Sequence, residues 1–170
     1  MKIAIVLILI FVQLLALASG GSKCADEYAA KAEASRDKCE ASHPDSPENC
    51  NRGYQTFIAS IPRLCQGSNR RKRSDNDNST CVYSTKFQNT LCITDDYIYQ
   101  LGVAASTPCT SYNQGQQKCA GLITSITCSL GQWTIEQLCP SGTMCLSLFG
   151  LIKNIVCGLL SPLTLLQQKN

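Results

Sequence analysis

The 170-residue sequence is poor in the residues that build metal centres. It contains a single histidine, His43, in the polar stretch S-H-P-D-S-P, and no two cysteines in a C-x-x-C arrangement. Structural zinc sites use four cysteine or histidine ligands, usually including closely spaced pairs. We therefore expect neither a metal nor another cofactor, and we interpret His43 as a solvent-exposed turn residue.

Charged residues are also few, and they are unevenly distributed. Lysine and arginine total 15 and aspartate and glutamate 12, which gives a formal charge of +3. This excess is too small and too scattered for a nucleic-acid-binding surface, so we expect no nucleic acid partner. After Asp96 the chain has only four more charged residues, namely Lys118, Glu136, Lys153 and Lys169.

The residue pairs that carry acid–base catalysis are missing as well. Asp95 and Asp96 form the only acidic pair in the weakly charged half, and neighbours on a strand point to opposite faces. Glycosidases need two carboxylates that face one bond at a controlled separation. His43 lies in the other half, so a serine or cysteine nucleophile has no evident base. We predict a protein without catalytic residues.

A long apolar run occurs at the N-terminus. Lys2 precedes I-A-I-V-L-I-L-I-F-V, and the small residues Ala16 and Ala18 follow. This pattern is typical of a secretory signal peptide, which we place over residues 1–20; an uncleaved anchor helix is the alternative. The predicted localisation is therefore secreted and extracellular, with the cell wall as one destination.

The C-terminal segment is apolar but broken. Lys153, Asn154 and Pro162 interrupt it, and its last residues are polar. These interruptions argue against both a membrane span and a lipid-anchor signal, so we expect no transmembrane anchoring. We expect the segment to pack as core and treat residues 159–170 as a tail; docking on a partner or on a bilayer surface is the alternative.

Cysteine, by contrast, is abundant. Twelve cysteines follow the signal peptide, an even number at the density of a disulfide scaffold in an oxidising compartment. Four precede the polar stretch 66–80 and eight follow it, and these even counts predict two separately closed modules. Eight cysteines allow 105 pairings, so the bridges among the last eight stay open. The predicted disulfide cysteines are Cys24, Cys39, Cys50, Cys65, Cys81, Cys92, Cys109, Cys119, Cys128, Cys139, Cys145 and Cys157.

Residues 21–65 predict a four-cysteine antiparallel helical hairpin. The first helix, about residues 25–41, is rich in good helix formers, and the second begins at Ser46-Pro47-Glu48 with a capping residue, a proline and an acid. Each helix has two cysteines fifteen residues apart, about four turns. Antiparallel packing therefore predicts the pairs Cys24–Cys65 and Cys39–Cys50. The predicted inner faces are Cys24, Tyr28, Ala32, Ser35 and Cys39, and Cys50, Tyr54, Phe57, Ile58, Ile61 and Cys65.

Residues 66–80 predict a processing linker. The stretch is polar and lacks apolar periodicity. The run Arg70, Arg71, Lys72 and Arg73 resembles sites cut by furin-like or Kex2-like proteases, which makes a processing protease an expected partner; a solvated basic patch is the alternative. Asn78 begins an N-glycosylation acceptor sequence, which needs an exposed loop.

From Cys81 onward short runs of Val, Tyr, Thr, Ile and Phe alternate with turn residues, which predicts several short strands. We divide this half into a short-stranded segment, 81–108, and a module, 109–158. Gly131 predicts a hairpin turn before a strand over 132–138. The predicted fold class is a small disulfide-rich α+β protein, with the helical hairpin at its N-terminus and a short-stranded, disulfide-stapled β module at its C-terminus.

One stretch of the module resembles a known family. Residues 128–145 read C-x-x-G-x-W-x5-C-P-x-G-x-x-C, preceded by Lys118-Cys-Ala-Gly121 and followed by Ile155-Val-Cys-Gly158. This arrangement resembles the fungal family 19 carbohydrate-binding modules, small chitin-binding domains often attached to chitinases. The resemblance covers residues 109–158, under a third of the chain. The D-x-x-D-x-D-x-E pattern of the associated chitinases is absent.

The resemblance implies a secreted, non-catalytic protein that binds chitin or another neutral N-acetylglucosamine glycan. Trp133 is the expected stacking contact, with Tyr112, Gln132 and Asn113 adding stacking and hydrogen bonds; a core role for Trp133 and solvated roles for the others are the alternatives. The alternative function is a processed, disulfide-rich effector, inhibitor or surface protein that binds another protein.

Overall fold

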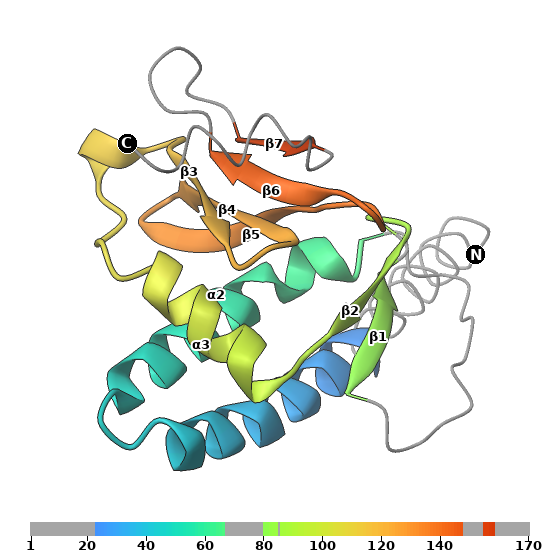
Figure 1. The fold of residues 1–170 in the computed structure, drawn as a ribbon, viewed down its shortest axis with the longest axis vertical. Coiled ribbons are helices and arrows are strands. Elements are labelled where there is room, and N and C mark those ends of the chain that lie inside the picture. The colour runs from blue at the N-terminus through green and yellow to red at the C-terminus, as the bar shows by residue number, and fades with distance from the viewer. Residues whose placement is uncertain (1–22, 67–79, 85, 148–154, 159–170) are drawn as a thin grey trace, which may run out of the picture.

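The computed structural model describes residues 23–66, 80–84, 86–147 and 155–158, and these form an α+β, disulfide-rich fold as predicted (Figure 1). The predicted signal peptide, the basic run 70–73, Asn78 and the tail 159–170 lie outside the described residues. Within the ranges that are described, no helix is long and apolar enough to cross a membrane.

The N-terminal half is the predicted helical hairpin. Residues 23–42 are helical, and α2 (Pro47–Leu64) follows after a short turn. Both predicted disulfides are present, Cys24–Cys65 with a Cα–Cα distance of 5.9 Å and Cys39–Cys50 with 5.7 Å. The predicted inner face of the first helix is confirmed, since Tyr28, Ala32, Ser35 and Cys39 are at most 2% exposed. Pro47 occupies the start of α2 as expected, although the Ser46 side chain makes no capping hydrogen bond.

The segment 81–108 differs from the predicted run of strands. After β1 (Cys81–Ser84) and β2 (Asn89–Cys92), the chain forms a helix, α3 (Asp95–Ala104). The Thr94 hydroxyl accepts a hydrogen bond from the Tyr97 backbone at 3.1 Å, and two acidic residues occupy the first turn. A capped N-terminus with acidic residues stabilises a helix even where tyrosine and isoleucine favour a strand.

The described residues of 109–158, namely 109–147 and 155–158, form short antiparallel strands, as predicted. A central sheet has the order β3-β4-β5, and two-stranded ladders join β1 to β2 and β6 to β7. The turn between β4 and β5 contains Leu130 and Gly131 at φ 52° and 81°, the left-handed pair typical of tight hairpins. The central strands are β3 (Gln117–Ala120), β4 (Thr124–Ser129) and β5 (Gln132–Leu138), and the outer pair is β6 (Met144–Ser147) and β7 (Ile155–Gly158).

All eight cysteines of this half pair with one another. Cys81–Cys92 closes the β1–β2 ladder across directly opposed positions. The other three bridges overlap along the chain. One joins the segment before the 3₁₀ turn η1 (Ser111–Asn113) to β4, one joins β3 to β6, and one joins the end of β5 to β7. These bridges are Cys109–Cys128, Cys119–Cys145 and Cys139–Cys157.

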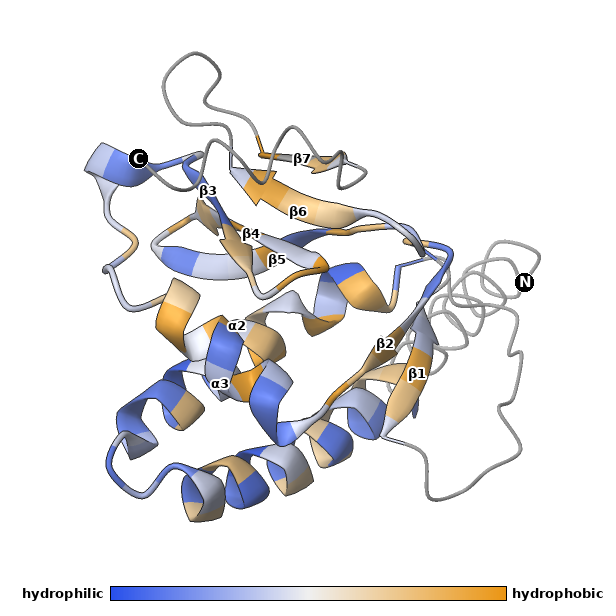
Figure 2. Cartoon of the chain, viewed as in Figure 1, coloured by the Kyte–Doolittle hydropathy of each residue, from blue (hydrophilic) through white to orange (hydrophobic). Residues whose placement is uncertain are grey.

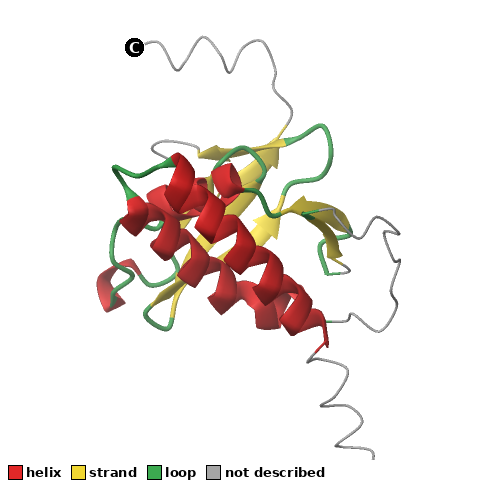
Figure 3. Cartoon of the chain, turned by 90° about the horizontal axis from the view of Figure 1, so that it is seen from below, coloured by secondary structure: helices red, strands yellow, loops and turns green. Residues whose placement is uncertain are grey.

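A single apolar core joins the two halves. Figure 3 shows the helices gathered in one layer with the strands behind them, and Figure 2 shows apolar stretches, in orange, on α2, α3 and β2. Phe57 of α2 and Tyr97 of α3 meet edge to face, with ring centroids 6.4 Å apart. Ile98 and Leu101 of α3 and Ile135 of β5 are fully buried in the same cluster.

The helices α2 and α3 touch backbone to backbone. A Cβ atom on Gly53 would lie 1.8 Å from the Ile98 carbonyl oxygen, and one on Gly102 would lie 1.7 Å from the Asn49 carbonyl oxygen. Both separations are far below van der Waals contact. Glycine at these two positions is therefore what lets the helices approach so closely, and it buries a second face of α2 that the hydrophobic pattern did not predict.

The helix α2 also covers the free edge of the central sheet. The Ser60 hydroxyl accepts a hydrogen bond from the Ile135 backbone at 2.7 Å and donates one to the Thr56 carbonyl. Arg63 of α2 pairs with Glu136 on the same strand. An uncovered edge strand invites pairing with other chains, so this contact protects β5.

Two modules with separate cores are therefore not what the structure contains. The disulfides do close separately on either side of residues 66–80, as the even cysteine counts predicted. The core, however, crosses that boundary, and the Ser35 hydroxyl of the first helix donates to the Ile93 carbonyl at 2.5 Å. The disulfides among the first four and among the last eight cysteines close each half covalently. The apolar core, in contrast, is buried only when both halves pack together.

The glycine contact predicts a large steric effect of one methyl group. We expect Gly102→Ala to lower the free energy of unfolding by about 3 kcal/mol, because the added Cβ overlaps a carbonyl oxygen held in a helix. Gly115→Ala is the matched control: its φ is +78° but nothing lies within 4 Å of the added Cβ. Strain alone should cost that variant about 1 kcal/mol. Urea denaturation measures both, and equal losses would contradict a steric cause.

The shared core predicts how a protein cut in the linker behaves. We expect the two pieces produced by a furin-like protease after Arg73 to migrate together in native size-exclusion chromatography, since the core holds them. They should separate in denaturing electrophoresis without reductant, because no disulfide joins them. Separation under native conditions would show that the halves fold independently after all.

Candidate binding cleft

Trp133, the predicted stacking contact, is a buried side chain. It is only 5% exposed, and its Nε1 donates a hydrogen bond to the Thr107 carbonyl at 2.7 Å. The Lys118 ammonium lies over the ring, 4.7 Å from its centroid. A sugar ring could not lie flat on this indole, because one face is taken by the cation and the rest is enclosed. The core alternative describes Trp133 better than the stacking role.

Asn113 also has a structural place rather than a free side chain. Its Oδ1 accepts a hydrogen bond from the Thr110 backbone at 2.6 Å, and its Nδ2 donates to the Pro108 carbonyl at 2.8 Å. These bonds hold the η1 turn against the Cys109–Cys128 bridge. The amide is thereby already paired, so we do not assign Asn113 to ligand contact.

Tyr112 and Gln132, in contrast, are accessible. Tyr112 on η1 is 100% exposed, and Leu130 in the β4–β5 turn is 92% exposed. The backbone of Gly115 donates to the Cys128 carbonyl at 2.8 Å, which holds the η1 loop beside the end of β4. Tyr112, Leu130 and Gln132 therefore lie at the same end of the central sheet, on a framework fixed by a disulfide.

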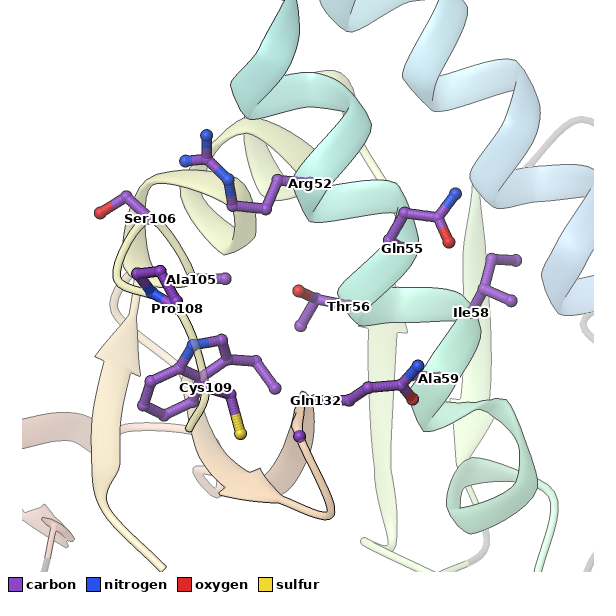
Figure 4. Close-up of a pocket in the computed structure, with 12 residues that line it drawn as sticks. Arg52, Gln55, Thr56, Ile58, Ala59, Ala105, Ser106, Pro108, Cys109 and Gln132 are labelled. Atoms are coloured by element: carbon purple, nitrogen blue, oxygen red, sulfur yellow. The ribbon is translucent and has the colours of Figure 1, made fainter. Parts of the chain in front are cut away.

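A cleft of about 590 Å³ opens at this end of the sheet (Figure 4). Such a volume lies within the roughly 300–1,000 Å³ typical of small-ligand pockets. Figure 4 shows Thr56 of α2 directed across the cleft toward Pro108 and Cys109, with Gln132 at its lower side. The lining residues are Arg52, Gln55, Thr56, Ile58, Ala59, Ala105, Ser106, Pro108, Cys109, Gly131, Gln132 and Trp133.

The cleft combines an apolar floor with a polar rim. Ile58, Ala59 and Pro108 supply the apolar surface that a ligand can reach, because Trp133 and Ala105 are buried. The side chains of Gln55, Gln132 and Ser106 are exposed, and no hydrogen bond to another described residue engages them. Amides and hydroxyls with free hydrogen-bonding capacity above an apolar surface can bind a ligand that has both apolar faces and polar substituents.

The electrostatic character of the cleft is positive. Arg52 is the one charged lining residue, and its Nη1 donates to the Asn49 side chain at 3.0 Å and to the Gly102 carbonyl at 3.3 Å. Lys118 lies behind Trp133, donates to the Ala104 carbonyl at 3.4 Å, and has a pKa lowered by burial. Neither cation has a carboxylate within 4 Å among the described residues.

The polar residues considered for catalysis do not line the cleft, and two of them lie on a helix where the sequence predicted a strand. Asp95 and Asp96 are in the first turn of α3 rather than on a strand. His43 is not a free turn residue, because its ring stacks on Tyr99 with centroids 3.9 Å apart, and its Nε2 lies 4.0 Å from Asp96. The Ser42 hydroxyl donates to Asp95 at 3.2 Å. These contacts hold the hairpin turn against the start of α3.

Sequence reasoning missed the α2 side of the cleft. Arg52, Gln55, Thr56 and Ala59 recur at helical spacing on one face of α2, next to the face formed by Gly53 and Ser60. The small residues Gly53, Thr56 and Ser60 were the available signal, because small residues at such spacing allow close helix packing. The sequence, however, does not indicate that this face of α2 lies opposite residues 105–109 and 131–133, which follow it some fifty to eighty positions later.

Comparison with known proteins gives no further assignment: no family of known proteins, no curated protein and no solved structure matches the chain.

The burial of Trp133 predicts that two aromatic substitutions differ greatly in their effect on stability. Trp133→Ala should lower the free energy of unfolding by about 3–5 kcal/mol, as expected for a large core side chain. Tyr112→Ala should change it by less than about 0.5 kcal/mol, because that ring is fully exposed. Urea denaturation followed by circular dichroism measures both. Equal stability of the two variants would contradict the position of Trp133 in the core.

Proposed function

We propose that the protein is a secreted, non-catalytic carbohydrate-binding protein that takes N-acetylglucosamine glycans such as chitin in the cleft between α2 and β5. The resemblance of residues 109–158 to chitin-binding modules suggests the ligand class. The proposal also retains the secretory signal, the glycosylated linker and its processing as expected properties of the precursor. It moves the main contacts away from Trp133 and onto the rim of the cleft.

The observation that supports the proposal is that neutral polar side chains with free hydrogen-bonding groups lie beside apolar surface in one cleft. Gln55 and Gln132 face the cleft from α2 and β5 without partners among the described residues. The acetamido and hydroxyl groups of N-acetylglucosamine pair with amides, and the apolar face of a pyranose ring packs on apolar side chains. Tyr112, three residues beyond Cys109, provides an exposed ring for stacking where a polymer extends past the cleft.

Protein binding is the second candidate, and one observation favours it. Tyr112 and Leu130 are two large, almost fully exposed side chains at one rigid end of the molecule. Tyrosine in such a position is common in protein interfaces. Under this alternative the protein is a processed effector, inhibitor or surface protein, and its partner contacts the Tyr112–Leu130 end without any requirement for glycan.

Binding to chitin beads, with cellulose beads as a control, tests the proposal. We expect the wild-type protein to bind chitin and not cellulose. Gln132→Ala and Gln55→Ala should each weaken binding about fivefold, equivalent to one lost hydrogen bond of about 1 kcal/mol. Tyr112→Ala should weaken it by a similar factor if stacking contributes about 1 kcal/mol.

Gln137→Ala is the matched control for these variants. Gln137 is exposed on the same strand as Gln132 but does not line the cleft. It should bind chitin as the wild type does, and all variants should keep their circular dichroism. Absence of wild-type binding to chitin would overturn the proposal, and an equal loss in Gln137→Ala would remove the cleft as the site.

A further inference from the structure

No acidic side chain is found among the residues that line the cleft. Arg52 is the only charged side chain among the lining residues, and its two hydrogen-bond acceptors, the Asn49 side chain and the Gly102 carbonyl, are both neutral. Both bonds involve Nη1. The Nε and Nη2 groups make no hydrogen bond to another described residue, so the guanidinium retains donors for a ligand.

The position of Arg52 is also fixed. The bond to Gly102 reaches from α2 to the C-terminal part of α3, at the place where the two helices touch. Figure 4 shows the Arg52 side chain extending from α2 toward Ser106 at the rim of the cleft. A guanidinium held in place loses less conformational entropy when it binds an oxyanion, and its planar fork matches a carboxylate.

A second cation adds to the same field. The Lys118 ammonium lies 4.7 Å from the centroid of the Trp133 ring, on the strand β3 beneath the floor of the cleft. No carboxylate of the described residues lies within 4 Å of it. Arg63 of α2 and Glu136 of β5 form an ion pair, so together they add no net charge. Positive charge at a concave, partly desolvated site favours an anionic ligand.

We infer that the preferred ligand of this cleft is an acidic glycan, one in which N-acetylglucosamine adjoins a sugar carrying a carboxylate that Arg52 binds. This inference rests on the proposed glycan-binding function and names the ligand class within it. Gln55 and Gln132 contact the acetamido sugar, and the Arg52 fork receives the neighbouring carboxylate. A neutral chitin oligomer satisfies the first contact only.

Three oligosaccharides of equal length test the inference with the full-length secreted protein in isothermal titration calorimetry. They are a chitin oligomer, a hyaluronan oligomer in which N-acetylglucosamine alternates with glucuronate, and the same hyaluronan oligomer after reduction of its carboxylates to alcohols. We expect the carboxylated oligomer to bind about tenfold more tightly than its reduced form at about 0.05 M salt, as for a charge-assisted pair. The preference should shrink to a few-fold or less at about 0.5 M salt.

Substitutions test whether Arg52 is the residue that recognises the carboxylate. Arg52→Gln should abolish the preference for the carboxylated oligomer over its reduced form. Arg52→Lys should retain part of it, because the charge remains but the bidentate geometry is lost. Lys38→Gln, which removes one exposed positive charge from the first helix, is the control for net charge and should change nothing.

The outcomes separate the two proposals. If the chitin oligomer binds and carboxylate reduction has no effect on the wild type, the inference fails and the proposed function stands. If the chitin oligomer does not bind, the proposed function fails and the inference that rests on it fails as well. A preference that persists in folded Arg52→Gln would show that another cation recognises the carboxylate. The wild-type comparison needs no variant, so it decides the ligand class even if Arg52→Gln does not fold.

Discussion

The contact between α2 and α3 at Gly53 and Gly102 is the constraint on which the rest of the structure depends. With a side chain at either position the helices would be forced apart, because the missing Cβ atoms would overlap backbone carbonyls. The close approach places α2 against both α3 and β5, so one helix of the hairpin packs on two elements of the second half. The disulfides hold each half closed, but this contact is what makes the halves one protein.

The cleft is a consequence of that assembly. Its walls come from α2, from the segment after α3 and from the β4–β5 turn, and none of these would form it alone. Arg52 shows this dependence on helix packing, since one of its hydrogen-bond partners, Asn49, lies on α2 and the other, Gly102, lies on α3. Ligand recognition at this site is therefore coupled to helix packing, and changes in the hairpin are expected to affect binding by residues 109–158.

Local patterns in the sequence predicted the local parts of the fold. Cysteines spaced by four helical turns gave the pairs Cys24–Cys65 and Cys39–Cys50, and Gly131 marked the hairpin turn before β5. These features follow from helix periodicity and backbone conformation, which act over a few residues. They need no knowledge of what packs against them.

The errors arose where distant segments decide the outcome. Tyr97 and Ile98 favour a strand by composition, yet the Thr94 cap and burial against Phe57 hold them in a helix. Trp133 drew attention as the only tryptophan, but its burial depends on Lys118 and Thr107. The bridges of the last eight cysteines likewise depend on strand order, which spacing alone does not determine. Whether Tyr112 and Gln132 bind a ligand stays a prediction.

The order of the disulfides along the chain governs how the protein responds to a single backbone break. Cys24–Cys65 spans the whole hairpin, and Cys109–Cys128, Cys119–Cys145 and Cys139–Cys157 overlap so that every peptide bond from Cys109 to Cys157 lies inside a covalent loop. Between Cys24 and Cys157, the peptide bonds outside any such loop fall between Cys65 and Cys81 and between Cys92 and Cys109. The second stretch is largely α3, whose Ile98 and Leu101 are buried. A protease can thus cut this chain at many sites without releasing a fragment, and the region of the basic linker is where one cut divides it into two chains.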